Sequence, residues 1–223
     1  MPAETAQSIV QVLLVEDHPM FRERLAAIIS KRGDMKVCGE ADNVHDAIEL
    51  TESLRPNIAI VDITLRGSNG LDLLKDLKAR GIEMPVLVLS MHDEAIYAER
   101  VLRAGARGYI TKYEASSEVM AAIEQVLSGE VYLSRQMTNS MLGRFAGGRK
   151  AADPGDVSIL TDRELDVFQR IGRGETPRDI AAALHVGVTT VDTYRARIKE
   201  KLGLKKGNEL QRRAMVWVQE NPA

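Results

Sequence analysis

QVLLVEDHP, at residues 11–19, sets a short apolar run directly before two acidic side chains. Such a run, followed by a helical pattern over 19–31, is typical of a parallel strand buried on both faces. The same succession recurs, with strands expected at 11–15, 37–41, 58–61, 85–89 and 108–111, and helices at 19–31, 44–54, 71–80, 94–103 and 117–127. These βα units predict an α/β doubly wound, five-stranded parallel sheet.

Polar side chains stand where the expected strands end: Glu16 and Asp17, Asp62, Ser90 and Lys112. Because ligands of open parallel sheets bind at the carboxyl ends of the strands, these groups are expected to gather at one edge. Carboxylates suit Mg²⁺, and a carboxylate beside such an ion can attack a phosphoryl group. An acid after a strand is, taken alone, more often a helix cap or a solvated turn. It is the placement of one group at each strand end that indicates a site.

The composition of the 223 residues, 44% apolar and 28% charged, indicates a soluble globular protein. The single cysteine, Cys38, excludes an intrachain disulfide and is interpreted as a small core residue. No apolar run approaches about 20 residues, and the first ten residues lack a signal-peptide core, so a cytoplasmic location is expected. The histidines show no metal-ligand spacing and are interpreted mostly as surface or turn residues: His18, His45, His92 and His185.

Charge is distributed unevenly along the chain. Residues 1–134 carry 14 basic and 21 acidic side chains, whereas residues 135–223 carry 16 and 11. Within 188–213 there are 8 basic and 3 acidic side chains. This local excess indicates a surface that faces a polyanion, with an ordinary solvated helix face as the alternative.

The pattern changes after residue 130, and three parts are predicted: a first domain at 9–130, a linker at 131–157 and a second domain at 158–220. The linker holds a possible short helix at 134–145 and the small, polar stretch GGRKAADPG at 147–155. The second domain is expected to be a separate all-α unit of four helices, the first opening on the capping-box spacing of Thr161 and Glu164. A short helix at 177–184, a tight turn and a longer helix at 189–202 suit helix-turn-helix architecture.

One face of the helix at 189–202 is apolar, and the opposite face presents small side chains between cations. This arrangement fits a helix in the major groove of DNA. The candidate DNA-binding residues are Thr190, Asp192, Thr193, Arg195, Ala196, Arg197, Lys199 and Lys201. Asp192 is open between a base contact and a capping role three residues after Thr189. Tyr194 lies on the apolar stripe and favours packing over base stacking.

Residues 9–130 resemble the receiver domains of response regulators through VEDHP (15–19), VDITLRGSNGLDLL (61–74), LSMHDE (89–94) and GYITK (108–112). The resemblance implies a flavodoxin-like fold. It implies that Asp62 accepts phosphate and that Mg²⁺ is bound by Glu16, Asp17, Asp62 and the backbone carbonyl of Thr64. The remaining implied roles are a switch hydroxyl, a switch aromatic and a phosphate-pairing lysine, which fall on Ser90, Tyr109 and Lys112. Thr64 and His92 are hypothesised to tune the lifetime of the phosphoryl group.

Residues 158–217 resemble the LuxR/FixJ-type helix-turn-helix family, the NarL-type output domain, through LTDREL (160–165), IAAALHVGVTTV (180–191) and TYRARIKEKLGL (193–204). The resemblance implies double-stranded DNA as a partner, bound as a homodimer, and a structural role for Glu164. A helix at 208–219, with Leu210, Ala214 and Trp217, is a candidate dimer contact. The alternative is that these side chains cover the core of their own domain.

Together the two ends predict a DNA-binding response regulator, switched when a sensor histidine kinase phosphorylates Asp62. It is not an enzyme in the usual sense, although the receiver catalyses its own phosphoryl transfer and hydrolysis. One alternative is a phosphohydrolase of the haloacid-dehalogenase type. Thr64 argues against it, because such enzymes place a second aspartate there. Another is a phosphate-independent DNA-binding module with a vestigial receiver.

Overall fold

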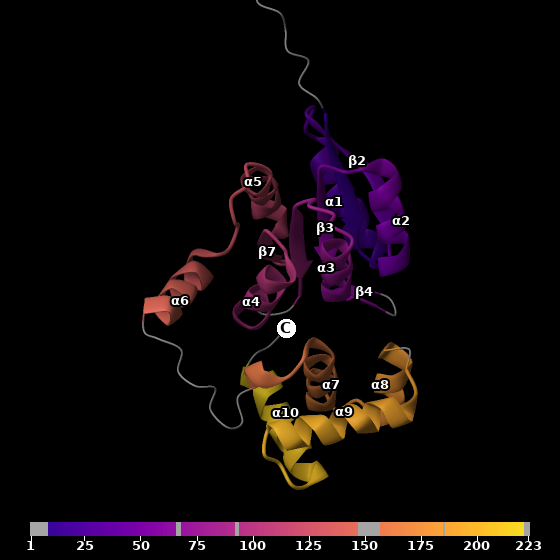
Figure 1. Ribbon diagram of the computed structural model, residues 1–223, viewed down its shortest axis with the longest axis vertical. Coiled ribbons are helices and arrows are strands. Elements are labelled where there is room, and N and C mark those ends of the chain that lie inside the picture. The colour runs from indigo at the N-terminus through magenta and orange to yellow at the C-terminus, as the bar shows by residue number, and fades with distance from the viewer. Residues whose placement is uncertain (1–8, 66–67, 92–93, 147–156, 185, 221–223) are drawn as a thin grey trace, which may run out of the picture. The chain divides into compact units, whose positions relative to one another are not determined.

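The structure is a computed structural model that describes residues 9–65, 68–91, 94–146, 157–184 and 186–220. The chain divides into two compact units, Met1–Thr138 and Asn139–Ala223 (Figure 1). Of the helices described, none is both long and apolar enough to cross a membrane.

Five parallel strands form the centre of the first unit: β1 (Val10–Val15), β2 (Met35–Ala41), β3 (Ile58–Asp62), β6 (Val86–Ser90) and β7 (Gly108–Thr111). Their order is β2-β1-β3-β6-β7, which confirms the predicted sheet. The direction in which strands are added reverses between β1 and β3. In such sheets this reversal opens a crevice at the carboxyl ends of the two strands.

Helices cover both faces of this sheet: α1 (Pro19–Ser30), α2 (Val44–Leu54), α3 (Gly70–Ala79), α4 (Glu94–Ala104) and α5 (Ala115–Leu127). α1 and α5 pack on one face, where Leu25 and Ile123 join strand residues such as Leu14 in one buried cluster. The preceding residue of β1, Leu13, points to the other face and lies beside Leu50 of α2. Both faces of the strands are therefore apolar, as their sequences require.

Two features of the first unit lie outside the predicted pattern. β4 (Thr64–Leu65) and β5 (Ser68–Asn69) form a small antiparallel pair directly after β3. After α5, Tyr132 bridges to Gly108 in parallel, and the Tyr109 N–H donates to the Tyr132 carbonyl at 2.9 Å.

α6 (Arg135–Ala146) comes next in the chain, where the sequence predicts a short helix. The predicted GGRKAADPG linker lies outside the described residues.

The second unit is helical: a 3-10 turn at Val157–Ile159, then α7 (Asp162–Gly172), α8 (Pro177–Leu184), α9 (Val188–Lys201) and α10 (Gly207–Glu220). Its core joins Phe168, Ile180, Ile198 and Leu210, one side chain from each helix, all fully buried. The predicted capping box at the start of α7 is confirmed.

α7 and α10 pack at close range. A Cβ on Gly172 would lie 2.5 Å from the Ala214 carbonyl, so only glycine allows this approach. The Trp217 ring packs edge-on against Phe168, with ring centroids 5.8 Å apart. Leu210 and Ala214 are fully buried within the unit. Leu210, Ala214 and Trp217 therefore help to cover the core of their own unit, and a dimer contact through α10 stays a prediction.

Candidate functional site

The sheet brings the polar residues at its strand ends into one pocket. Glu16 follows β1, Asp62 ends β3, Ser90 ends β6 and Lys112 follows β7, and these four strands are neighbours in the sheet. All four side chains are buried. Charged groups are rarely fully buried unless they are paired, so their partners decide what the pocket can do.

Lys112 pairs with two of these carboxylates. Its Nζ lies 2.6 Å from Glu16 Oε2 and donates to Asp62 Oδ2 at 2.8 Å. Burial works against the charged ammonium, but the ion pairs with Asp62 and Glu16 outweigh it and raise the pKa of Lys112. The lysine is therefore a fixed cation at the centre of the pocket.

Asp62 is buried, and burial disfavours its charge. Burial raises the pKa of Asp62 to about 7, and the negative charge of Glu16 adds to the effect. Lys112 and the backbone N–H of Thr64 act in the opposite direction by stabilising the carboxylate. The site therefore favours a change that removes the negative charge from this oxygen pair or brings a further cation to it.

Gly70 is required by the loop that follows Asp62. The β4–β5 pair turns the chain back, so that the Gly70 N–H donates to the Ile63 carbonyl at 2.8 Å. A Cβ at position 70 would lie 2.2 Å from the Asp62 carbonyl oxygen, which no side chain allows. The spacing of Asp62 and Gly70 in the sequence thus has a steric cause.

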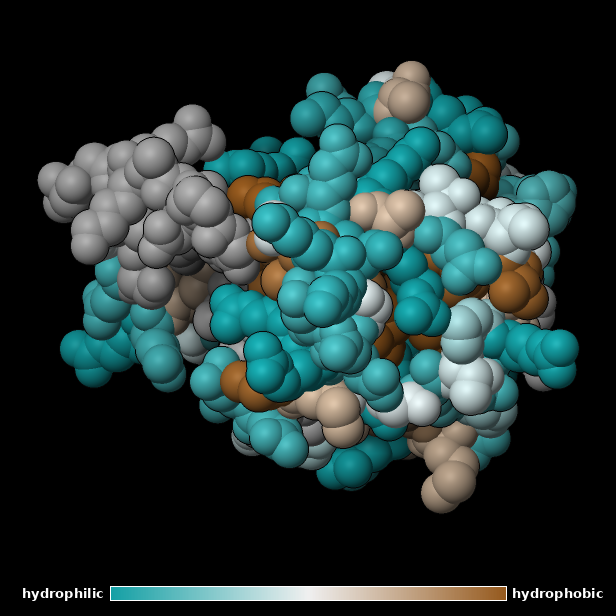
Figure 2. Space-filling view, turned by 90° about the horizontal axis from the view of Figure 1, so that it is seen from below, coloured by the Kyte–Doolittle hydropathy of each residue, from teal (hydrophilic) through white to brown (hydrophobic). Residues whose placement is uncertain are grey.

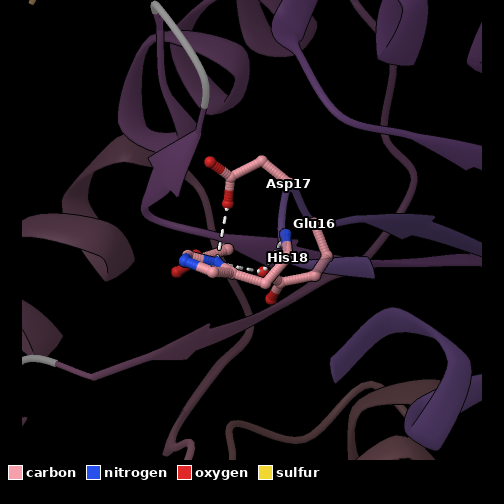
Figure 3. A group of neighbouring side chains, drawn as sticks. Glu16, Asp17 and His18 are labelled. Atoms are coloured by element: carbon pink, nitrogen blue, oxygen red, sulfur yellow. Dashed lines mark hydrogen bonds and ion pairs between the residues drawn. The ribbon is translucent and has the colours of Figure 1, made fainter. Parts of the chain in front are cut away.

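Asp17 and His18 directly follow Glu16 after β1, with the His18 ring turned toward both acids (Figure 3). His18 Nδ1 lies 2.9 Å from Glu16 Oε1 and 2.8 Å from Asp17 Oδ1. Burial raises the pKa of Asp17, opposed by the nearby His18. The His18 side chain is 65% exposed, as expected of a surface or turn residue. The sequence did not predict its contact with both acids. The available signal was its place directly after the two acids.

The donor set fits an oxygen-preferring divalent cation. Potential ligand atoms of Glu16, Asp17, His18 and Asp62 all lie within 4.8 Å of one another. Asp17 Oδ1 is buried, and the nitrogen beside it, His18 Nδ1 at 2.8 Å, is shared with Glu16. A buried carboxylate oxygen in that state is stabilised by a cation. Thr64, on β4, has an exposed side chain, and its carbonyl as a ligand stays a prediction.

Ser90 and Tyr109 lie next to each other on the neighbouring strands β6 and β7. Both are fully buried, and the Tyr109 hydroxyl is hydrogen-bonded to the Ser90 side chain. Burial raises the pKa of Tyr109, so the phenol stays neutral. The structure thus joins the predicted switch hydroxyl and switch aromatic. His92, the other predicted tuning residue, lies outside the described residues.

α9 presents the predicted DNA-binding residues in two groups. Thr190, Asp192, Thr193, Ala196 and Arg197 are exposed, whereas Arg195, Lys199 and Lys201 are half-buried. The face of the molecule in Figure 2 is mostly hydrophilic, with apolar residues scattered among polar ones. Val191 and Ile198 point into the core, as the apolar stripe predicts.

Lys201 has a partner inside its own unit. Its Nζ donates to Glu164 Oε2 at 2.6 Å, and that carboxylate also accepts from the Thr161 N–H in the capping box. Burial alone would raise the pKa of Glu164, but Lys201 and the cap outweigh it and lower the pKa. The sequence did not indicate this role, because the pair is 37 residues apart. The DNA contact of Lys201 stays a prediction.

Asp192 does not complete a helix cap, so the capping interpretation is wrong. α9 begins at Val188 with Gly187 as its N-cap, and this N-cap makes no side-chain hydrogen bond. Thr189 is therefore inside the first turn, and its carbonyl accepts from the Thr193 hydroxyl. The helix starts one residue earlier than predicted, which removes the cap geometry.

Comparisons with known proteins match both units. Residues 12–124 match the response regulator receiver domain, and residues 158–214 match the luxR family of bacterial regulatory proteins. The chain is 32% identical to the nitrate/nitrite response regulator NarL of Escherichia coli, over 96% of this chain and 97% of NarL. It is also 32% identical to the virulence transcription regulator BvgA of Bordetella pertussis, over 86% and 90%.

Solved structures of response regulators match over most of this chain. The response regulator ChrA of a heme-sensing two-component system is 26% identical, with a TM-score of 0.51 over 94% of this chain and 98% of ChrA. RcsB of Salmonella enterica serovar Typhimurium, bound to the promoter rprA with a beryllofluoride phosphomimetic, is 19% identical. Its TM-score is 0.63 over 93% and 99% of the two chains, a likeness of fold.

Proposed function

The chain belongs to the NarL/FixJ family of response regulators, in which a receiver domain precedes a LuxR-type DNA-binding domain, and on that premise we propose that phosphorylation of Asp62 by a sensor histidine kinase switches its binding to DNA. The observation that carries the proposal is the placement of Asp62. It is a buried carboxylate at the end of β3, bonded to Lys112 and grouped with Glu16 and Asp17.

In the transfer step, a carboxylate oxygen of Asp62 attacks the phosphorus of the phosphohistidine. The O–P bond forms as the P–N bond breaks, and the histidine of the kinase leaves with its electron pair. The product is an acyl phosphate, whose carbonyl end carries no charge. The negative charge of the product lies on the phosphoryl oxygens, and Lys112, which now pairs with Asp62, remains to pair with them.

Glu16, Asp17, Asp62 and the Thr64 carbonyl would hold a Mg²⁺ ion at the mouth of the pocket. The ion, when bound, supplies positive charge that offsets the repulsion between the carboxylates and the phosphoryl oxygens. The close grouping of the ligand atoms of Glu16, Asp17 and Asp62 supports this assignment. The receiver also catalyses loss of its own phosphoryl group, with Thr64 and His92 as the residues that tune the rate.

The response to phosphorylation passes through Ser90 and Tyr109. New phosphoryl oxygens next to β6 offer the Ser90 hydroxyl an acceptor other than its present partner Tyr109. A change in that hydrogen bond alters the edge of the sheet formed by β6 and β7. The second unit then binds paired DNA half-sites as a homodimer, with the exposed residues of α9 in the major groove and its cations on phosphates.

Mass spectrometry of the protein treated with acetyl phosphate and Mg²⁺ tests the assignment of the acceptor. The parent is expected to gain one phosphoryl group, mapped to the peptide that contains Asp62, and the Asp62→Asn variant none. Asp72, a half-buried acid on α3, supplies the matched control, because Asp72→Asn should leave the gain unchanged. A phosphoryl group that persists in Asp62→Asn would place the acceptor elsewhere.

A further inference from the structure

The ring of Phe21 faces the ammonium group of Lys112. Nζ lies 4.7 Å from the ring centroid, within the range of a cation–π contact. Phe21 is on the first turn of α1, the helix that begins three residues after Glu16. The sequence motifs at the strand ends do not include Phe21 and predict no role for it.

The Lys112 ammonium has three N–H donors in a tetrahedral arrangement. Two have carboxylate oxygens within reach, from Glu16 at 2.6 Å and from Asp62 at 2.8 Å. The negative face of the Phe21 ring is a further neighbour that attracts the charge without offering a lone pair. The contact is shielded from solvent, because the Lys112 side chain is only 5% exposed. Shielding is the condition under which cation–π contacts are strongest.

We propose that Phe21 is a positioning residue for phosphoryl transfer, and that its ring holds the Lys112 ammonium in place beside Asp62 by a cation–π contact. This inference rests on the proposed phosphorylation of Asp62.

The value of an aromatic ring at this place follows from what phosphorylation changes. Formation of the acyl phosphate moves the negative charge from the Asp62 carboxylate to the phosphoryl oxygens, so Lys112 must exchange one carboxylate partner for a phosphoryl oxygen without leaving its place. The ring keeps its attraction, because its quadrupole does not depend on the state of Asp62. It also leaves the donors of Lys112 available, whereas a third carboxylate would compete with the phosphoryl oxygens.

A plain packing role is the competing explanation. Phe21, Leu25 and Ile29 recur at a spacing of four residues on the buried side of α1, and Phe21 packs against the core cluster. Any side chain of similar volume would meet that need. The two explanations differ in one respect: packing depends on shape and apolar area, whereas the cation–π contact depends on the charge distribution of the ring.

Stepwise fluorination of Phe21 separates the two. Replacement by mono-, di- and trifluorophenylalanine keeps the shape of the ring and progressively removes its negative face. The measurement is the dissociation constant of the full-length protein for beryllofluoride with Mg²⁺, and the urea midpoint of each variant monitors folding. We expect the dissociation constant to rise stepwise, by roughly three- to tenfold for the trifluoro ring. The same series at Phe168, which packs on Trp217 in the other unit, is the matched control and should leave it unchanged.

A second pair of variants uses natural residues. Phe21→Leu is expected to weaken beryllofluoride binding by a similar factor, and Phe21→Tyr, which restores an aromatic face, to recover most of it. A flat response along the fluorinated series, with the parent binding and Asp62→Ala not binding, would overturn the role of Phe21 and leave the acceptor in place. If the parent itself fails to bind beryllofluoride, the proposed function of Asp62 fails instead.

Discussion

The acidic pocket and the exposed face of α9 both gather charge, but they hold it in opposite ways. In the pocket, Lys112, Glu16 and Asp62 are buried and satisfy one another at 2.6–2.8 Å. On α9, Asp192 and Arg197 are exposed to solvent. A buried charge is fixed by its protein partners, so its loss is felt by the fold. An exposed charge is free for an external partner, so its loss is felt by binding.

Of the variants considered, removal of Lys112 should cause the largest loss of stability. Lys112→Ala leaves Glu16 and Asp62 buried without their cation, and we expect the receiver to lose about 3–5 kcal/mol of stability. Urea unfolding of the full chain, followed by a probe in the first unit, measures the change. Lys205→Ala, at an exposed lysine that follows α9, is the control and should change stability by less than about 0.5 kcal/mol. Similar losses for both lysines would show that the pocket is not a coupled charge cluster.

The pH dependence of stability sharpens the account of Asp62. Its pKa of about 7 in the folded state lies above the ordinary 3.8, so folding favours the protonated acid. This contribution is fully present below about pH 4 and is lost as the pH rises through 7. Without Mg²⁺, the parent should therefore lose up to about 2–3 kcal/mol between pH 5 and pH 8 relative to Asp62→Asn. Parallel pH profiles for the two proteins in urea would contradict the raised pKa.

A variant of Lys201 tests whether every cation of α9 is free for an external partner. Because it pairs with the buried Glu164, Lys201→Ala should destabilise the second unit by about 1–2 kcal/mol. Thermal unfolding of the variant, compared with Lys201→Arg, which keeps the charge, measures the effect. An unchanged midpoint for Lys201→Ala would show that the pair with Glu164 adds no stability. Lys201 would then count among the cations of α9 that are predicted to contact DNA.

Arg197 should show the smallest effect on the fold. Its side chain is exposed, so Arg197→Ala is expected to change stability by less than about 0.5 kcal/mol. If Arg197 contacts a phosphate, the slope of log affinity against log salt should fall by about 0.9. Fluorescence anisotropy with a duplex at several salt concentrations gives this slope. An unchanged slope would exclude the phosphate contact.

The fold and the pocket could be predicted from the sequence for one reason. Parallel strands place their last residues at one edge, so Glu16, Asp62, Ser90 and Lys112 were brought together by topology alone. What the sequence did not predict depends on side-chain directions. The turn of His18 toward two acids, the Phe21 ring facing Lys112 and the pairing of Lys201 with Glu164 follow from packing. The mistaken cap at Asp192 arose from a shift of one residue in the start of α9.

The most direct test of the account joins its two regions in one experiment. DNA binding by the full-length protein is measured with and without beryllofluoride and Mg²⁺, for the parent and for Asp62→Ala. We predict that beryllofluoride tightens DNA binding by the parent and leaves Asp62→Ala unchanged. Equal affinity in all four conditions would contradict the switch at Asp62 and leave a DNA-binding protein that does not respond to its receiver.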